Sequence, residues 1–156
     1  MIVFALDPGT RETGWVVYDS ERVCILAHGF DDNETLLLAI RNGLLSKADE
    51  MVCEKLEGFG ISVGEETMET IWWSGRFGEA WRKPPGVRVG RKTVKLHLCG
   101  TTSARDSHVD EALRCRFGVT KKHPGILKGL GKHERAALSV ALTHADRSHK
   151  EGLDGV

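Results

Sequence analysis

The chain has 156 residues, 40% of them hydrophobic and 28% charged, which is the composition of an ordinary globular domain. No apolar run approaches the roughly 20 residues that a membrane-spanning helix needs. The opening MIVFALDPGT also lacks the basic segment and cleavage site of a secretory signal. We therefore expect one cytoplasmic domain over residues 1–156 and exclude a membrane partner.

The charges are distributed unevenly along the chain, although the formal net charge is zero. Residues 1–70 contain 5 Lys/Arg and 14 Asp/Glu, whereas residues 71–156 contain 17 and 8. A neutral protein is by itself a poor candidate for nucleic-acid binding, but this asymmetry favours a basic face built from the second half. Charges that mix over the folded surface would explain the counts equally well.

The first third of the chain predicts three antiparallel strands. The apolar run IVFAL ends before Pro8, and Gly14 opens a second strand over about 15–18. A polar turn leads to a third strand over about 23–27. Asn33 can then cap a helix with the body TLLLAIRNGLL.

The middle of the chain predicts a short buried strand and a long helix. Met51 to Cys53 form the strand, which ends at Glu54. A glycine-rich loop over 58–64 leads to a helix from 65 to about 82, which ends before the two prolines that follow. We expect the aromatic side chains of this helix to pack in the core rather than stack on bases.

The last part predicts one more strand and two helices. The alternating VRVGRKTVKLHL at 87–98 favours a fifth strand or a bent pair of strands. A helix follows from 102 or 103 to 117, then a loop rich in Gly and Lys over 118–131, and a final helix over about 133–149. This order resembles the ribonuclease H-like fold, an α/β class with a five-stranded mixed sheet, antiparallel in its first three strands and flanked by helices.

Two carboxylates end buried strands of this predicted sheet. Asp7 follows the first strand directly, and Glu54 ends the fourth. In the fold named above these strands are neighbours, so the two side chains would meet at one sheet edge. Adjacent carboxylates repel each other, and a bound divalent cation relieves the repulsion. Hard oxygen ligands suit Mg²⁺ or Mn²⁺, which can activate water against a phosphodiester.

The motifs, taken in order, resemble the RuvC-type Holliday junction resolvases, and bacteriophage members in particular. The run from Asp7 to Trp15 looks like their D-P-G-x-x-x-x-G opening, and Val52-Cys53-Glu54 looks like their second acidic strand end. The segments GFGISVG, WWSGRFGEAW, VKLHL, SARDSHV and ALSVALTHAD follow in the family's order. The resemblance implies a homodimeric, Mg²⁺-dependent endonuclease that nicks four-way and other branched DNA.

The last helix departs from the family pattern, which has an acidic residue or histidine followed three positions later by aspartate. Here His133 takes the first position and Ala136 the second. Both would face the metal site, because residues i and i+3 share a helix face. Histidine can ligate a metal or move a proton, but alanine can do neither. We hypothesise that Ala136 replaces an aspartate, and that Glu134 points away from the site and cannot substitute for it.

The sequence also contains basic and aromatic candidates for DNA contacts, of which Lys95 occupies the position that resembles the family's V-K. Lys95 would project from the fifth strand toward the scissile phosphate, although a solvated strand lysine is equally compatible with the pattern. Phe59, five residues beyond Glu54, is either a wedge at the branch point or a core residue. The remaining phosphate-binding candidates are Arg76, Arg82, Lys83, Arg88, Arg91, Lys92, Arg105, Lys121, Lys122, Lys128 and Lys132.

Three other functions compete with this one. An RNA-processing nuclease similar to the short YqgF-type proteins would share the fold and the opening motif. An actin-like ATPase also begins with a D-x-G-T hairpin, but it needs two such domains and over twice this length. A non-catalytic module that binds branched DNA would agree with the missing aspartate.

Overall fold

A five-stranded mixed sheet forms the centre of the chain, in the order β3-β2-β1-β4-β5. The computed structural model describes residues 1–57, 62–81, 83 and 86–154, the last four of these by backbone alone. β1 (Ile2–Asp7), β2 (Glu12–Asp19) and β3 (Cys24–Asp32) run antiparallel, and β4 (Glu50–Lys55) and β5 (Val87–Gly90) continue the sheet in parallel pairing from β1. The predicted fold class, with its antiparallel first three strands, is confirmed.

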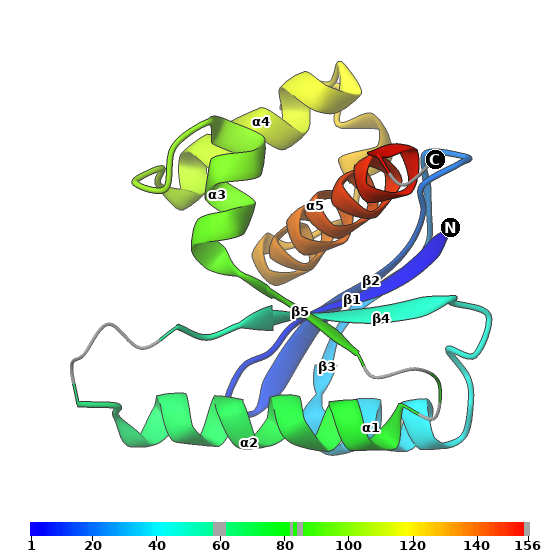
Figure 1. The fold of residues 1–156 in the computed structure, drawn as a ribbon, viewed down its shortest axis with the longest axis vertical. Helices are drawn as coiled ribbons and strands as arrows, with labels where there is room; N and C mark the ends of the chain where they lie inside the picture. Colours follow the sequence, from blue (N-terminus) through cyan, green and yellow to red (C-terminus); the bar gives the residue numbers. More distant parts are fainter. Residues whose placement is uncertain (58–61, 82, 84–85, 155–156) are drawn as a thin grey trace.

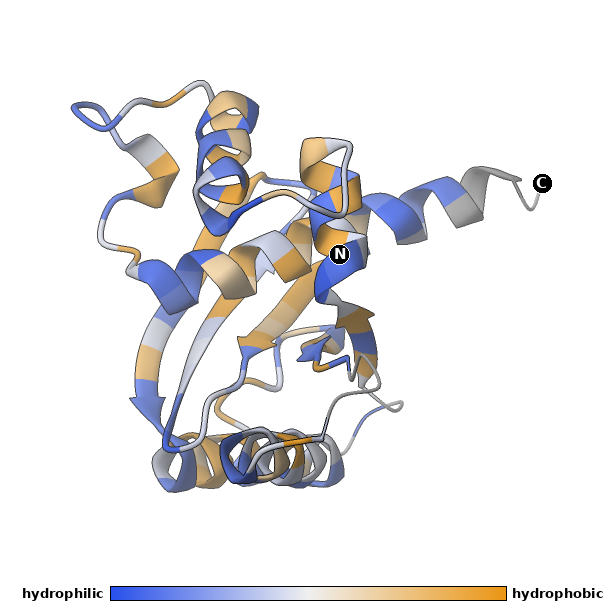
Figure 2. Cartoon of the chain, turned by 90° about the vertical axis from the view of Figure 1, so that its left-hand side faces the viewer, coloured by the Kyte–Doolittle hydropathy of each residue, from blue (hydrophilic) through white to orange (hydrophobic). Residues whose placement is uncertain are grey.

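Helices cover both faces of the sheet (Figure 1). On one face lie α1 (Asn33–Arg41) and α2 (Glu65–Ala80); on the other lie α3 (Arg91–Cys99), α4 (Asp106–Phe117) and α5 (Lys132–Asp154), with a 3-10 turn at Gly125–Leu127 before α5. The end of α5 extends from the body as a hydrophilic stretch (Figure 2). No helix in the described ranges combines the length and the apolar character needed to cross a bilayer.

The alternation of side chains along β1 divides the core into two clusters. Val3 and Ala5 pack on the α5 side, whereas Phe4 and Leu6 pack on the side of α1 and α2. This is the period of two that a strand buried on both faces requires. All four side chains are fully buried, so β1 is held in place from both sides, and with it the carboxylate that ends it.

The predicted second half of the fifth strand was wrong. The strand stops at Gly90, and residues 91–99 form α3 instead. Val94 and Leu98, four residues apart, lie on one helical face, and both belong to the cluster around α5. The alternating pattern was therefore ambiguous, and burial against α5 selects the helix.

Two helix starts also differ from the prediction. Asp32, not Asn33, caps α1, because its carboxylate accepts hydrogen bonds from the backbone N–H groups of Glu34 and Thr35 at 3.0 and 3.2 Å. The buried Asn33 instead accepts from the hydroxyl of Thr13 at 2.6 Å. The fourth helix begins at Asp106 rather than at 102 or 103.

Gly14 allows the first turn of α5 to lie directly on β2. A Cβ atom built on this glycine would lie 2.5 Å from both the carbonyl carbon and the Cβ of His133. Contacts this short involve backbone atoms, which cannot move without displacing the helix. The glycine of the D-P-G-x-x-x-x-G motif thus brings α5 to the end of β1.

We expect Gly14→Ala to destabilise the fold by about 1–3 kcal/mol, because the added methyl group overpacks this contact. Gly75→Ala in α2 is the matched control: nothing lies within 4 Å of its added Cβ, so the helix propensity of alanine should stabilise it by roughly 0.5–1 kcal/mol. Urea unfolding followed by circular dichroism measures both. Equal effects at the two glycines would contradict the close packing at Gly14.

Candidate active site

The carboxylates of Asp7 and Glu54 lie together at the end of the two central strands. Leu6 pairs with Cys53 in the parallel β1–β4 register, so the next residues on both strands are neighbours. Both line one pocket of about 240 Å³. Their side chains are only 15% and 7% exposed. The other residues that line this pocket are Pro8, Leu56, Arg91, Asp106, Lys132, His133 and Ala136.

Burial and proximity make these two carboxylates hard to ionise together. Burial raises the pKa of Asp7 above its ordinary value. Burial and the neighbouring Asp7 carboxylate raise the pKa of Glu54 to about 7. It is unfavourable for two buried, neighbouring carboxylates to be charged at the same time, and a bound cation would remove this free-energy cost. The chemistry of this pair therefore suits a hard divalent ion.

A side chain of the protein already supplies one positive charge. The guanidinium of Arg91, the first residue of α3, donates to Oε1 of Glu54 at 2.8 Å and to Oδ1 of Asp106 at 2.6 Å. Burial opposes the charged form of Arg91, but the two carboxylates raise its pKa above the ordinary value. The same contact lowers the pKa of Asp106. Arg91 thus ties α3, β4 and α4 together at the pocket.

His133 reaches the pocket from the first turn of α5. Its Nδ1 lies 2.8 Å from Oδ2 of Asp7, and its ring stacks on Phe30 of β3 with centroids 5.0 Å apart and planes 8° from parallel. A carboxylate on one atom and an aromatic face on the ring leave the imidazole little freedom to turn. Ala136, one helical turn later, lines the same pocket.

The other acidic residues of α5 point elsewhere. Glu134 is buried, where its carboxylate contacts Nδ1 of His28 at 2.5 Å and accepts from the backbone N–H of Gly131 at 2.6 Å. Asp146 pairs with Arg116 and His97 nearly three turns along the helix. Neither lines the pocket around Asp7, so neither takes the place of a carboxylate at position 136.

Lys95 does not project from a strand, as the sequence predicted, because it belongs to α3. Its Nζ lies 3.8 Å from Oδ1 of Asp106, and it lines a second pocket beside the first. Arg91 and Lys132 line both pockets. These three cations are the predicted basic residues that the structure brings to the carboxylates.

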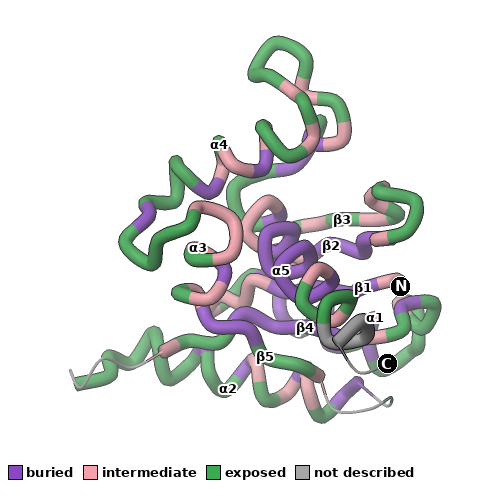
Figure 3. The backbone as a smooth tube through the Cα atoms, turned by 45° about the horizontal axis from the view of Figure 1, so that its top comes forward, coloured by how far each residue is buried: buried purple, intermediate pink, exposed green. Residues whose placement is uncertain are grey.

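The remaining basic candidates lie away from the carboxylates. Arg76 is on the opposite face of the sheet, paired with Glu34 and packed over the rings of Trp72 and Trp73. Lys83 donates to the carbonyl oxygens of residues 46 and 48. The other described candidates are exposed residues of β5, of α3, of the start of α4 and of the loop between α4 and α5 (Figure 3): Arg88, Lys92, Arg105, Lys121, Lys122 and Lys128. Phe59 and Arg82 lie outside the described residues.

The ligand set for a metal is incomplete as it stands. Within the described part of the chain, no three His, Cys, Asp or Glu side chains are arranged to hold an ion. Asp7 and Glu54 lie at the strand ends, the carboxylate of Asp106 in the same pocket is bound by Arg91, and position 136 carries only a methyl group. The donor chemistry of Asp7 and Glu54 fits a hard cation.

Two contributors to the site were not predicted from the sequence. In this segment the sequence indicated Arg105 as a candidate, but the structure places the carboxylate of the next residue, Asp106, in the pocket. Phe30 is 43% exposed at the end of β3, and only its stacking on His133 gives it a place in the site. The alternating burial of β3 leaves Phe30 on an exposed position, where a large aromatic side chain is a weak signal of such a contact.

Comparison with known proteins relates this geometry to solved structures. The chain superposes on the RuvC of Thermus thermophilus with a TM-score of 0.72 at 20% identity, covering 97% of each chain. The complex of that RuvC with a Holliday junction substrate gives 0.74 at 20% identity, covering 97% of this chain and 96% of that one. The fowlpox virus Holliday junction resolvase gives 0.58 at 15% identity, covering 94% and 99%. No protein-family model and no curated protein matches the chain. At these identities the comparison establishes a shared fold.

We expect Glu54 to make stability pH-dependent in EDTA. Its pKa rises from 4.5 to about 7 on folding, so the folded state binds the proton more tightly, and stability falls as the pH rises through this interval. Glu54→Gln has no ionisable group at this position, so it does not lose unfolding free energy in this way as the pH rises. Relative to the parent chain, the variant should gain on the order of 2–3 kcal/mol of unfolding free energy between about pH 5 and pH 8.

Urea unfolding at the two pH values measures this difference. Glu111→Gln, which replaces an exposed carboxylate of α4, is the control and should follow the parent profile. Parallel profiles for Glu54→Gln and the parent would mean that Glu54 ionises as an ordinary surface carboxyl group does.

Proposed function

We propose that the chain is an endonuclease of the RuvC type, similar to the bacteriophage branch of that family, that binds four-way and other branched DNA. The observation that carries the proposal is one pocket that holds Asp7, Glu54, His133 and position 136. These are the positions that match the family motifs. The solved proteins that share the fold over nearly the whole chain include a RuvC and a viral Holliday junction resolvase, each also solved in complex with a Holliday junction.

In this proposal Asp7 and Glu54 hold Mg²⁺, with Mn²⁺ able to replace it. The ion, when bound, lowers the pKa of water and neutralises charge on the phosphate. His133, oriented by Asp7 and Phe30, ligates the ion or exchanges a proton at its imidazole. Lys132 and Arg91 present positive charge at the mouth of the pocket, where a DNA phosphate would approach. Lys95 takes a phosphate further along the same edge.

Ala136 limits the chemistry in this chain. Without a carboxylate at position 136, Asp7 and Glu54 bind the ion weakly, and hydrolysis is slow or absent. Binding of branched DNA depends on the basic surface and not on the ion, so it remains. This deficit favours a second candidate function, a module that holds branched DNA without cutting it.

Ala136→Asp tests the proposal directly. We expect it to raise Mg²⁺-dependent nicking of a four-way junction by at least about a hundredfold, the scale on which a misassembled catalytic centre loses rate. Ala136→Asn is the matched control, because asparagine has the size of aspartate without its charge, and this variant should remain inactive. Adding Asp7→Asn to the Ala136→Asp chain should abolish the gain.

The substrate separates the remaining alternatives in the same assay. Linear duplex and structured RNA are included beside the four-way junction. Preferential cleavage of RNA would replace the proposed function with RNA processing. Tight junction binding with no cleavage after Ala136→Asp would identify the chain as a binding module, and the nuclease proposal would then be abandoned.

The proposed enzyme acts as a homodimer, because a junction has two opposed strands to cut. α2 presents Met68, Ile71 and Trp72 at the helical spacing of one face, each about half exposed or more. An apolar row on the outer helix is a surface that a second copy of the chain would cover.

Ile71→Asp should therefore convert the dimer to a monomer, because the charge would have to be buried in the interface. Sedimentation velocity measures the mass of the species. Lys92→Asp, on the opposite side of the sheet, is the control and should leave the mass unchanged. A monomeric parent chain at micromolar concentration would remove α2 as the dimer surface.

A further inference from the structure

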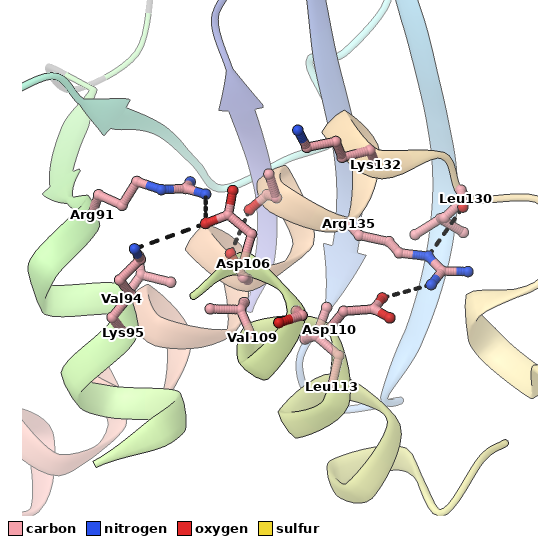
Figure 4. Close-up of a pocket in the computed structure, with 13 residues that line it drawn as sticks. Arg91, Val94, Lys95, Asp106, Val109, Asp110, Leu113, Leu130, Lys132 and Arg135 are labelled. Atoms are coloured by element: carbon pink, nitrogen blue, oxygen red, sulfur yellow. Dashed lines mark hydrogen bonds and ion pairs between the residues drawn. The ribbon is translucent and has the colours of Figure 1, made fainter. Parts of the chain in front are cut away.

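A second pocket lies beside the carboxylates, and the proposed function assigns no ligand to its interior. It has a volume of about 370 Å³ and lies between α3, α4 and α5 (Figure 4). Four residues line both pockets: Arg91, Asp106, Lys132 and Ala136. At the shared wall, position 136 contributes only a methyl group. The two pockets therefore meet at the side chain that departs from the family pattern.

The interior of this pocket is apolar. Val94 of α3, Val109 and Leu113 of α4 and Leu130 before α5 face it, and all four are buried among the helices. Val94, Leu113 and Leu130 belong to the cluster around α5. A cavity of this size with apolar walls fits an organic ring system better than a hydrated ion.

The mouth of the pocket is polar and mostly cationic. Arg91, Lys95 and Lys132 line it on the side of the carboxylates. Asp110 and Arg135 lie on the far side, joined at 2.6 Å, and Arg135 also donates to the carbonyl of Leu130 at 3.1 Å (Figure 4). Positive charge at one edge and a hydrogen-bonding pair at the other suit a ligand with an anionic group on one side and a polar edge on the opposite side.

We propose that this pocket receives an unstacked nucleobase from the DNA strand whose phosphate lies at Asp7 and Glu54. A base has two apolar faces and a polar edge, and its own backbone phosphates supply the negative charge that the mouth requires. The inference rests on the proposed function, because it takes branched DNA as the ligand. Extruding a base costs least where its pairing or stacking is already disturbed, and opening of the arms at a branch point disturbs the stacking of the bases beside it.

The residues that the two pockets share indicate which ligand occupies the second pocket. A phosphate beside the carboxylates places the attached nucleoside within reach of the shared wall at Ala136. The basic residues of the mouth repel a cationic peptide segment and attract the phosphates of a nucleic-acid backbone. Ser107 lies at the rim on the first turn of α4, where it is exposed and can be replaced without opening the core.

The test uses the full chain in EDTA, so that no strand is cut. Four-way junctions carry a single 2-aminopurine at successive positions around each branch, and its fluorescence reports unstacking. One position on each of the two opposed strands held at the carboxylates should brighten several-fold on binding. Ser107→Trp, which fills the mouth, should cancel this rise and weaken junction binding roughly tenfold, the scale of one lost base contact. Thr102→Trp, an exposed residue outside the pocket, is the matched control and should change neither.

Three outcomes would overturn the inference. If the junction binds tightly and no position brightens, the base pocket is refuted while the proposed function stands. Brightening that survives Ser107→Trp in a chain with unchanged circular dichroism places the extruded base elsewhere. If the unmodified chain shows no preference for the junction over linear duplex, the proposed function fails and the inference fails with it. The 2-aminopurine scan of the unmodified chain needs no variant, so a misfolded Ser107→Trp leaves the test intact.

Discussion

The parallel pairing of β1 with β4 is the constraint on which the rest of this protein depends. It places two carboxylates side by side at the end of strands that are buried on both faces. Ionising both at once is unfavourable there, and the raised pKa of Glu54 expresses that cost. The fold holds the two groups together nonetheless, because the apolar residues that precede them on each strand anchor the backbone.

The surrounding elements supply what this pair lacks. Arg91 begins α3 and brings a positive charge to Glu54, and Asp106 of α4 accepts a hydrogen bond from the other guanidinium nitrogen of Arg91. His133 comes from α5 and is held between Asp7 and Phe30. Three helices on one face of the sheet therefore converge at the ends of β1 and β4, and Gly14 permits the close approach of α5.

Position 136 connects the chemistry of the site with its shape. A carboxylate there would add a ligand to the pair and would also narrow the opening between the two pockets. Alanine contributes only a methyl group to the wall that the two pockets share, which adds no metal-binding atom and takes little space. In the proposed function, one position therefore bears both on the ion site and on the space beside it.

That the first and fourth strands are neighbours, and that an aspartate is expected at position 136, was implied only by the resemblance to a known family. The sequence by itself determined the three antiparallel strands at the start and the two carboxylates at strand ends, because each depends on residues close together in the chain. Hydrophobic alternation and glycine or proline breaks are local signals of this kind. Only the tertiary structure decided that residues 91–99 form a helix, since Val94 and Leu98 fit both periodicities and packing on α5 selects one. It also decided which charges meet: His133 and Asp7 are 126 residues apart, and Arg91 and Glu54 are 37 apart. Such contacts are created by strand register and helix packing, which no short stretch of sequence contains.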